Sequence, residues 1–339
     1  MLRTAIVGLG WWGTTLVDAV ANSDQMKMVA AFTRSNSDKD KAFTTERGLK
    51  LVNTYEALLN DPEIDAIILA TQPKGHRDQV VGAAKAGKHV FCEKPFMMNR
   101  AEAVEAVKAC EDAGVTLGLG YNRRFHPSWL DLKRRIKDGE LGTILHMECT
   151  MSGPNGLSLS TDAWRYSPEE APCGGLFPMG VHAIDGFIDL AGDVDQVFCQ
   201  SLHRAVPGDN DDTTSVLFKM AGGMSAYLGV MTATSGSFRF QVYGSKGVAA
   251  LGGMTHVVGQ SSHQRRSGLF GSYVIKPLKG DAESIEVPEF DLNKAELEAF
   301  ATAALGGPAY PITHADMIQA VAATEAIVAS ARTGQAVRV

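Results

Sequence analysis

A glycine-rich segment close to the N-terminus has the residue types that hold the phosphates of a dinucleotide. It reads Gly8-Leu9-Gly10-Trp11-Trp12-Gly13, and it lies between a strand-like run, residues 4–7, and a helix-like pattern. The first glycine of such a segment permits a tight turn, the second lets the backbone approach a pyrophosphate, and the third lets the helix pack against the sheet. The N–H groups that open the helix attract the phosphate charge. This context predicts a dinucleotide site at residues 8–13.

The second strand-like run, residues 28–32, leads into the residues that would meet the ribose of the dinucleotide. A chain that binds NAD usually has an acidic residue there, which bonds the ribose 2′-hydroxyl. This chain has Thr33, Arg34 and Ser35 instead. A hydroxyl and a guanidinium suit a 2′-phosphate, which a carboxylate would repel. The segment therefore favours NADP(H) over the alternative, NAD(H). Arg34 could also be a solvated loop residue that does not contact a cofactor.

A lysine stands at the carboxyl end of another apolar run. Residues 89–92 lead directly into Glu93-Lys94-Pro95. Ligands of open α/β sheets bind at the carboxyl ends of the strands, so Lys94 is placed to donate a hydrogen bond to a substrate oxygen. The alternative is a lysine in a surface turn, which is where most lysines lie.

A histidine and an aspartate begin a later helix-like pattern. A glycine-rich turn, residues 173–180, leads into a helix on which His182 and Asp185 are three residues apart and share a face. Histidine is the side chain best suited to move a proton near neutral pH. The alternative is a packed, hydrogen-bonded histidine without a catalytic role.

The elements that must position these residues fall into two groups. Up to residue 122, continuous apolar runs alternate with helix-like patterns, which is typical of parallel strands covered on both faces in a doubly wound α/β domain. Strands are expected at residues 4–7, 28–32, 66–70, 89–92 and 115–119, and helices at 80–86 and 101–112, closed by Gly87 and Gly114.

After residue 122 the strand-like segments follow one another with glycine turns between them, which indicates a large, mainly antiparallel open sheet. We therefore expect a Rossmann domain at residues 1–122 and an α+β domain at residues 123–339. In the second domain strands are expected at residues 143–150, 196–205, 213–220, 224–231 and 237–243, and helices at 128–137, 180–190, 294–305 and 314–331.

Composition excludes several classes of protein. The 339 residues suit two domains, and a net charge of −6 without a basic cluster argues against a nucleic-acid surface. No apolar run is long enough for a membrane helix, and Met1 leads at once into a strand, so we expect no signal region and a cytoplasmic location. The five cysteines are odd in number and scattered, which predicts free thiols and no metal site.

Together these segments resemble the Gfo/Idh/MocA family, which includes glucose–fructose oxidoreductase and inositol dehydrogenase, over essentially the whole chain. The segments that carry the resemblance are residues 8–13, 66–71 with His76, 86–95, 120–125, Trp164-Arg165, 180–185 and, near the C-terminus, 326–330 and 333–335. The stretch around Glu93-Lys94-Pro95 is the most specific of them.

The resemblance implies roles for individual residues. Lys94 matches the active-site lysine of the family, Pro95 a proline that is often in cis, and His182 the acid/base histidine. Asp185 matches a frequent substrate contact. Further pocket positions are Arg123, Arg124, Trp164 and Arg165, and the segments with Thr71, His76 and Glu93 would line the cofactor. The family layout also implies a homodimer or homotetramer formed through the C-terminal sheet.

Two departures from the family pattern concern the substrate. Many sugar and inositol members have Asp four residues before the histidine, where this chain has Pro178, and Thr71-Gln72-Pro73 departs from the more usual Thr-Pro-Asn. The expected function is hydride transfer between the nicotinamide and a small sugar-like or cyclitol-like molecule. The alternatives on the same fold are a dinucleotide-sensing regulator without turnover and an NAD-dependent glycosidase.

Overall fold

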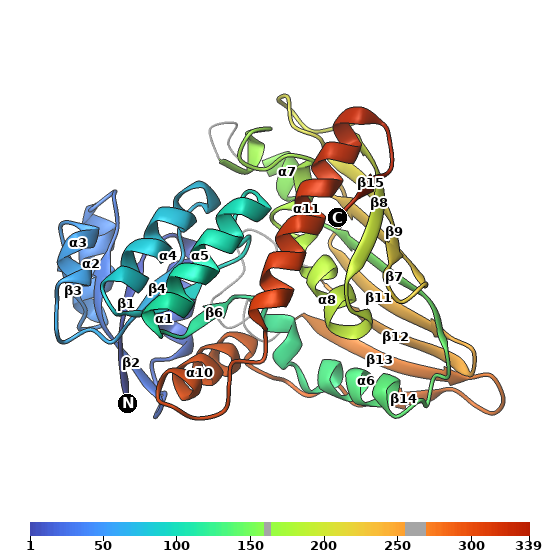
Figure 1. The fold of residues 1–339 in the computed structure, drawn as a ribbon, viewed down its shortest axis with the longest axis horizontal. Coiled ribbons are helices and arrows are strands. Elements are labelled where there is room, and N and C mark those ends of the chain that lie inside the picture. Colours follow the sequence, from blue (N-terminus) through green and yellow to red (C-terminus); the bar gives the residue numbers. More distant parts are fainter. Residues whose placement is uncertain (159–163, 255–268) are drawn as a thin grey trace. The chain divides into compact units, whose positions relative to one another are not determined.

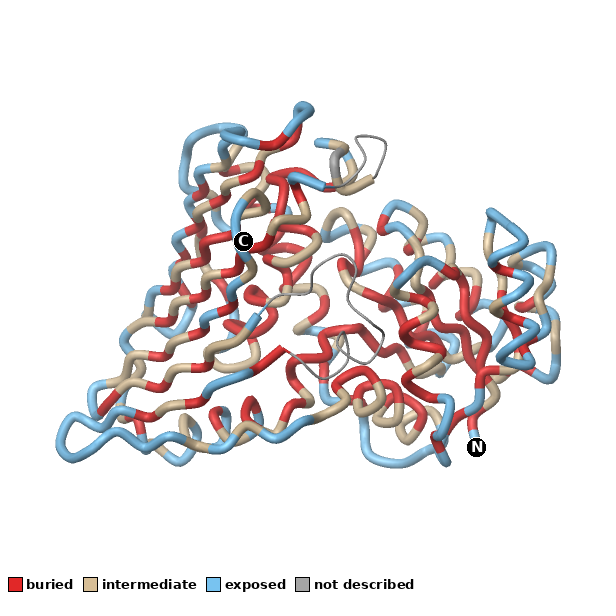
Figure 2. The backbone as a smooth tube through the Cα atoms, turned by 180° about the vertical axis from the view of Figure 1, so that it is seen from behind, coloured by how far each residue is buried: buried red, intermediate tan, exposed pale blue. Residues whose placement is uncertain are grey.

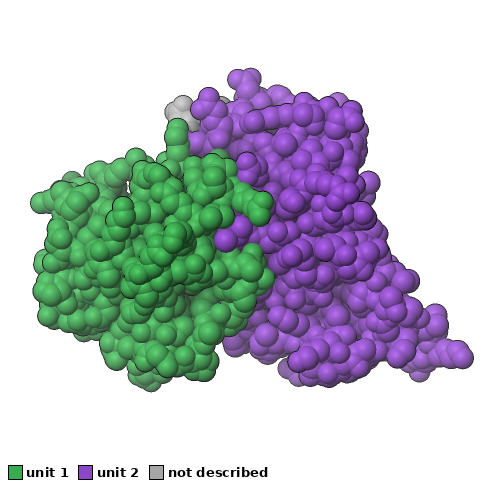
Figure 3. Space-filling view, viewed as in Figure 1, with its two compact units in different colours: residues 1–122, 291–317 green, residues 123–290, 318–339 purple. Residues whose placement is uncertain are grey.

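The computed structural model describes residues 1–158, 164–254 and 269–339 of the chain (Figure 1 and Figure 2). The chain divides into two compact units, which Figure 3 distinguishes by colour. Unit 1 comprises Met1–Asn122 and Asp291–Met317, and unit 2 comprises Arg123–Phe290 and Ile318–Val339. The division after residue 122 coincides with the expected one, whereas residues 291–317 group with unit 1 and not with the rest of the C-terminal half.

Unit 1 contains a six-stranded sheet in which every pair of neighbours is parallel, so the predicted doubly wound domain is confirmed. Its order is β3-β2-β1-β4-β5-β6, the order of dinucleotide-binding folds, with the reversal between β1 and β4. The strands are β1 (Leu2–Val7), β2 (Met26–Phe32), β3 (Lys50–Val52), β4 (Ala66–Leu69), β5 (His89–Cys92) and β6 (Leu117–Leu119).

Local sequence explains where the helices of unit 1 begin and end. Ser37 and Asp40 form a capping box at the start of α2, and the Asn99 side chain accepts a hydrogen bond from the Glu102 N–H at the start of α5. Gly114 ends α5 with φ of 65°, as predicted, because glycine takes this conformation without steric strain. The helices are α1 (Trp11–Ala19), α2 (Asp38–Glu46), α3 (Tyr55–Leu59), α4 (His76–Lys85), α5 (Arg100–Ala113) and α10 (Leu292–Ala304).

Helix α10 explains why a segment late in the chain groups with unit 1. The Phe300 ring of α10 meets the Phe91 ring of β5 edge to face, with 5.6 Å between the ring centroids. Gly118 of β6 leaves space for both rings, since a Cβ there would lie 2.8 Å from Phe300 and 2.9 Å from Phe91. The apolar face of α10 therefore packs on the β5–β6 end of the parallel sheet.

Unit 2 is built on a nine-stranded sheet with the order β14-β13-β12-β11-β7-β10-β9-β8-β15. Only the β7–β10 pair of this sheet is parallel among the described strands, so the predicted, mainly antiparallel sheet is confirmed. The strands are β7 (Ile144–Ser152), β8 (Val194–Leu202), β9 (Thr213–Met220), β10 (Ser225–Met231), β11 (Ser237–Gly244), β12 (Gly247–Gly253), β13 (Phe270–Pro277), β14 (Glu283–Ile285) and β15 (Val337–Arg338).

One face of this sheet is covered and the other is not. Phe187 of α8 contacts Phe218 and Phe240 of the sheet, and Trp129 of α6 also contacts Phe240. Buried and exposed residues alternate along β9 and β11, which is typical of a sheet with one solvated face (Figure 2). The helices of unit 2 are α6 (Pro127–Lys137), α7 (Asn155–Ser158), α8 (Val181–Ala191) and most of α11 (His314–Thr333).

Three further findings bear on function. No helix among the described residues has both the length and the apolar composition that crossing a membrane requires. The same residues contain no group of three or more His, Cys, Asp or Glu side chains arranged to hold a metal ion. All five cysteines are free and buried.

Candidate active site

The glycine turn after β1 has the close packing that its sequence predicts. Gly8 has φ of 96°, and a Cβ there would lie 2.5 Å from the Ala70 carbonyl oxygen. A Cβ on Gly13 would lie 2.0 Å from the Gly8 carbonyl oxygen, whereas one on Gly10 would meet no described atom within 4 Å. The backbone at Gly10 is therefore open at the start of α1, where the first-turn N–H groups of a helix can donate hydrogen bonds to phosphate oxygens. This cradle fits a dinucleotide.

The segment after β2 offers hydroxyl groups and a cation. The Thr33 and Ser35 hydroxyls lie 3.2 Å apart, and the exposed Arg34 guanidinium has a long contact of 3.5 Å to the Gln72 side chain. The nearby carboxylate, Asp40, is buried and accepts hydrogen bonds from Ser35 and from Ser37. Its acceptor capacity is thus used inside the α2 cap, and Arg34 remains the charged side chain of this segment.

His76 links two segments, because its ring contacts the residue after Lys94 and the segment that follows β4. Its ring is fully buried, with Nδ1 2.9 Å from the Pro95 carbonyl oxygen and Nε2 3.2 Å from the Thr71 carbonyl oxygen. Burial lowers the pKa of His76, so the ring is neutral and one nitrogen donates. His76 and Thr71, both predicted to line the cofactor, lie together at this edge of the sheet, and their contact with a cofactor stays a prediction.

The Glu93-Lys94-Pro95 segment follows β5 directly. The Lys94–Pro95 peptide bond is cis, which confirms the expectation for Pro95. The Lys94 backbone N–H donates to Glu93 Oε2 at 3.1 Å, and Lys94 itself is partly exposed. The Glu93 carboxyl group packs over the backbone at the end of β6, since a Cβ on Gly120 would lie 2.8 Å from its atoms.

Helix α10 adds two buried polar residues that the sequence analysis missed. Glu296 and Asn293 are both fully buried, and neither carboxylate oxygen of Glu296 has a hydrogen-bond partner among the described residues. The Asn293 side-chain oxygen accepts a hydrogen bond from Asn122 at 2.8 Å. Both residues share the buried face of α10 with Leu297 and Phe300, and this helical spacing is the signal that could have identified them.

Burial changes the protonation of two buried glutamates of unit 1, Glu93 and Glu296. Burial raises the pKa of Glu93 to about 7, although the neighbouring Lys94 charge lowers it. Burial, and then the charge of Glu93, hold the pKa of Glu296 well above its usual range, again against the influence of Lys94. Two carboxyl groups that share an apolar site do not both ionise, because the second charge would face the first without solvent.

In unit 2, His182 is the second residue of α8 and is partly buried. Trp129 packs closely against this helix at Gly186, since a Cβ there would lie 2.8 Å from the Trp129 ring. The Phe187 ring of the same helix packs into the core of the sheet. His182 and Lys94 thus belong to different units, and each is held by the rigid elements of its own unit.

Arg124 and Asp185, both predicted to bind substrate, form a buried ion pair. Arg124 Nε and Nη2 donate to the Asp185 carboxylate at 2.9 and 2.6 Å. Arg124 Nη1 also donates to Asp189, which in addition accepts from the Trp129 indole N–H. Much of the hydrogen-bonding capacity of Asp185 is therefore used within the protein, and its direct contact with a substrate stays a prediction.

Arg123 and Arg165 have a different environment. Arg123 is 7% exposed, with Nη1 3.5 Å from Met151 Sδ and its guanidinium 4.8 Å from the Phe238 ring centroid. The Arg165 guanidinium lies 4.5 Å from the Trp164 ring centroid. Neither has a hydrogen-bonded carboxylate among the described residues, and burial lowers the pKa of each to about 10. Both remain charged at neutral pH, and a buried cation such as Arg123 normally has an anionic or oxygen-rich partner.

The order of the parallel sheet and the glycine turn after β1 place unit 1 in the class of dinucleotide-binding α/β domains. Residues 2–121 match the model of the oxidoreductase family with an NAD-binding Rossmann fold, and residues 129–250 match the GFO/IDH/MocA C-terminal domain. The chain belongs to the Gfo/Idh/MocA family of oxidoreductases, as the sequence segments predict.

Individual relatives are similar over most of the chain. The uncharacterized oxidoreductase YrbE of Bacillus subtilis is 31% identical over 256 residues, which cover 73% of this chain and 72% of the relative. The 1,5-anhydro-D-fructose reductase of Ensifer adhaerens is 26% identical over 319 residues, covering 92% and 91%. The structure of a provisionally assigned NADPH-dependent oxidoreductase from Desulfitobacterium hafniense has a TM-score of 0.91 at 25% identity, covering 99% and 97%.

The buried state of Glu296 predicts a pH dependence of stability. Its pKa is raised in the folded state, so the stability that it contributes is complete below the unfolded-state pKa, about 4.3, and is lost as the pH rises toward the folded value. Glu296→Gln removes this loss. The free energy of unfolding of the variant, relative to that of the wild type, should rise by about 1.4 kcal/mol per pH unit between about pH 5 and pH 7. Urea unfolding measures both free energies.

Glu298→Gln is the matched control for this measurement. Glu298 lies on the same helix, keeps 29% of its side chain exposed and accepts a hydrogen bond from Ser23 at 2.7 Å. We expect it to keep the pH dependence of the wild type. The same dependence in Glu296→Gln as in the wild type would contradict the buried, proton-holding state of Glu296.

Proposed function

We propose that the chain is an NADP(H)-dependent dehydrogenase or reductase. It would transfer hydride between C4 of the nicotinamide and a carbinol or carbonyl carbon of a small polar substrate, such as a sugar or a cyclitol. The observation that carries this proposal is that the glycine cradle, Thr33–Arg34–Ser35 and Lys94 all follow the carboxyl ends of parallel strands in one sheet, where ligands of such sheets bind. The bound dinucleotide supplies the hydride chemistry.

The residues of the chain then divide the remaining work. The first-turn N–H groups after Gly10 bind the pyrophosphate, with Leu9, Trp11 and Trp12 bordering it. Lys94 donates a hydrogen bond to the substrate oxygen and stabilises negative charge there while the carbon changes its oxidation state. His182 takes the hydroxyl proton in oxidation and returns it in reduction.

The substrate is expected to carry several oxygen atoms. The buried Arg123 and the partly exposed Arg165 are cations without a hydrogen-bonded carboxylate among the described residues, so each can donate to hydroxyl or carboxylate oxygens of a ligand. Trp164 offers a ring against which a sugar face can lie. Asp185, which pairs with Arg124, would accept a hydrogen bond from a substrate hydroxyl group. The relative named for 1,5-anhydro-D-fructose supports a substrate of this kind.

Arg34 provides the test of cofactor preference. We expect NADPH to bind more tightly than NADH, because Arg34 can pair with a 2′-phosphate, and Arg34→Asp should reverse the order through charge repulsion. Fluorescence titration gives both dissociation constants. Lys27→Asp is the control, since Lys27 is an exposed cation at the opposite end of β2. Equal or tighter NADH binding by the wild type would remove this part of the proposal.

Lys94 and His182 provide the test of the reaction. Lys94→Met keeps most of the side-chain stem but removes the donor, and His182→Ala removes the acid/base group. Each should lower turnover by about 10²–10⁴-fold, the usual contribution of a positioned proton-transfer group, while NADPH affinity changes little. The double variant should lose less than the product of the two factors, because both residues serve one oxygen.

His146→Ala is the control for this pair of variants. His146 is a partly buried histidine of β7 that bonds the Ser225 hydroxyl at 2.8 Å. It should retain turnover. A Lys94 or His182 variant with full turnover in a sugar and cyclitol screen would show that the residue has no catalytic role, and a joint loss of NADPH binding would point to a structural one.

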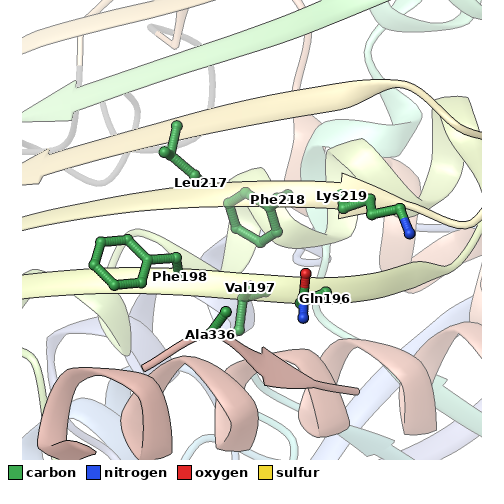
Figure 4. Close-up of a pocket in the computed structure, with 7 residues that line it drawn as sticks. All are labelled: Gln196, Val197, Phe198, Leu217, Phe218, Lys219 and Ala336. Atoms are coloured by element: carbon green, nitrogen blue, oxygen red, sulfur yellow. The ribbon is translucent and has the colours of Figure 1, made fainter. Parts of the chain in front are cut away.

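We also propose that the chain forms a homodimer or homotetramer through the uncovered face of the large sheet. This face exposes the apolar side chains Phe198 and Leu217, which border a shallow hollow with Gln196, Lys219 and Ala336 (Figure 4). Exposed apolar patches of this kind mark protein interfaces. Light scattering should give a molar mass that is a multiple of the 36.2 kDa of one chain, and Leu217→Lys should lower this mass. A wild-type mass of one chain at micromolar concentration would remove the proposal.

A further inference from the structure

The proposed mechanism uses Lys94 but gives no part to the carboxyl group of Glu296 on α10, with which Lys94 interacts electrostatically. Glu296 is fully buried, and among the described residues its two oxygens accept no hydrogen bond. A buried carboxylate without hydrogen bonds or a counter-charge is strongly unfavourable, so such a group normally holds a proton or serves a nearby cation. The cation of this neighbourhood is Lys94, and the second acid is Glu93.

A purely structural role explains Glu296 poorly. Helix α10 is already fixed by Phe300, which packs on Phe91 and over Gly118. Asn293, one turn before Glu296, supplies the polar contact of this face through its hydrogen bond with Asn122. An apolar side chain at position 296 would complete the same packing without the unfavourable burial of an acid.

If Lys94 is charged, only one protonation state of Glu93 and Glu296 gives the three groups a net charge of zero. With both glutamates ionised the buried cluster has a net negative charge, and with both protonated it has a net positive charge. One proton shared by Glu93 and Glu296 leaves one negative charge opposite one ammonium group. Two like acids in one apolar site favour this shared state, since the first charge opposes the second.

We propose that Glu296 is a positioning residue for Lys94: together with Glu93 it holds one proton and one negative charge, and this charge keeps the Lys94 amine in its ammonium form. The proposal rests on the proposed function only for the use of that ammonium at the substrate oxygen. The state of the three groups is a property of the chain without substrate. The raised pKa values of both glutamates are in keeping with it.

Two other titratable groups act on this cluster among the described residues. Asp291 precedes α10, and its carboxylate accepts the Lys294 N–H at 3.0 Å as the helix cap. Cys92 ends β5, and burial holds the pKa of its thiol well above the usual range, so it stays neutral. Asp291 adds negative charge near Glu296 and thus favours the protonated form of Glu296.

The first test measures Lys94 directly and needs no turnover. Lysines are converted to ¹³C-dimethyl-lysine, which still titrates, and the NMR signal that Lys94→Met removes is followed against pH. We expect the titration midpoint of this signal to stay close to the wild-type value in Glu296→Gln, in which Glu93 alone carries the negative charge, and to fall in Glu93→Gln/Glu296→Gln, which has no carboxylate left in the cluster. The fall should be about 1–3 pH units, the effect of removing a nearby opposite charge. Glu298→Gln should leave it in place.

The second test measures the proton on the carboxyl pair. At neutral pH the infrared spectrum should show the C=O stretch of a protonated carboxyl group, shifted in D₂O, and Glu296→Gln should remove or weaken it while NADPH binding is retained and the melting temperature is not lowered. A wild-type spectrum without this band, or a Lys94 midpoint that does not move in the double variant, would overturn the proposal.

The alkaline limb of the kcat/KM profile separates this proposal from the proposed function. If the Lys94 midpoint falls and the alkaline limb moves with it, both stand. If the midpoint falls and the limb does not move, Glu296 positions the charge of Lys94 but Lys94 does not act on the substrate. If Lys94→Met is inactive and the midpoint is unchanged, the proposed function stands and the role of Glu296 is wrong.

Discussion

The constraint on which unit 1 depends is that parallel strands all end at the same edge of their sheet. Because β1, β2, β4 and β5 run in one direction, the residues that follow them are gathered at that edge although they lie far apart in sequence. The glycine turn follows β1, Arg34 follows β2, Thr71 follows β4 and Lys94 follows β5. The proposed cofactor cradle and the proposed hydrogen-bond donor Lys94 thus belong to one rigid scaffold.

The second feature of this edge is its low polarity behind Lys94. Helix α10 returns from late in the chain and packs Phe300 against Phe91 of β5 and over Gly118 of β6, and Glu93, which follows β5, is buried. An acid in such a place attracts a cation strongly, yet it is itself hard to ionise. The charge of Lys94 therefore depends on helix α10, which lies about 200 residues further along the chain than Lys94. Unit 2 uses a related device, since Arg124 pairs with Asp185 and Asp189 inside an otherwise apolar core.

Local patterns made much of this fold predictable. Continuous apolar runs identified β1, β2, β4, β5 and β6, and glycines marked the ends of α4 and α5. Strand β3 was missed because Lys50–Val52 is only three residues long and not fully buried. The glycine turn expected between the strand-like segments 213–220 and 224–231 corresponds to the turn between β9 and β10, which pair in an antiparallel arrangement.

Long-range features were not predictable in the same way. The return of α10 to unit 1 depends on the fit of Phe300 over Gly118, which no local pattern reveals. The Arg124–Asp185 pair joins residues 61 positions apart, and each looked like a separate substrate contact in the sequence. Glu296 was passed over because an acid on a helix usually faces solvent, and only its spacing with Leu297 and Phe300 placed it on the buried face.

The most direct test of the account is to follow the hydride itself. The chain is incubated with NADPH that carries deuterium on one face of C4 and with a panel of keto sugars, anhydro sugars and oxidised cyclitols, and the products are examined by NMR and mass spectrometry. The account predicts deuterium on the new carbinol carbon of at least one product, from one face of the nicotinamide only, and its disappearance in Lys94→Met. Tight NADPH binding without deuterium transfer to any member of the panel would contradict the account and would favour a dinucleotide-sensing protein.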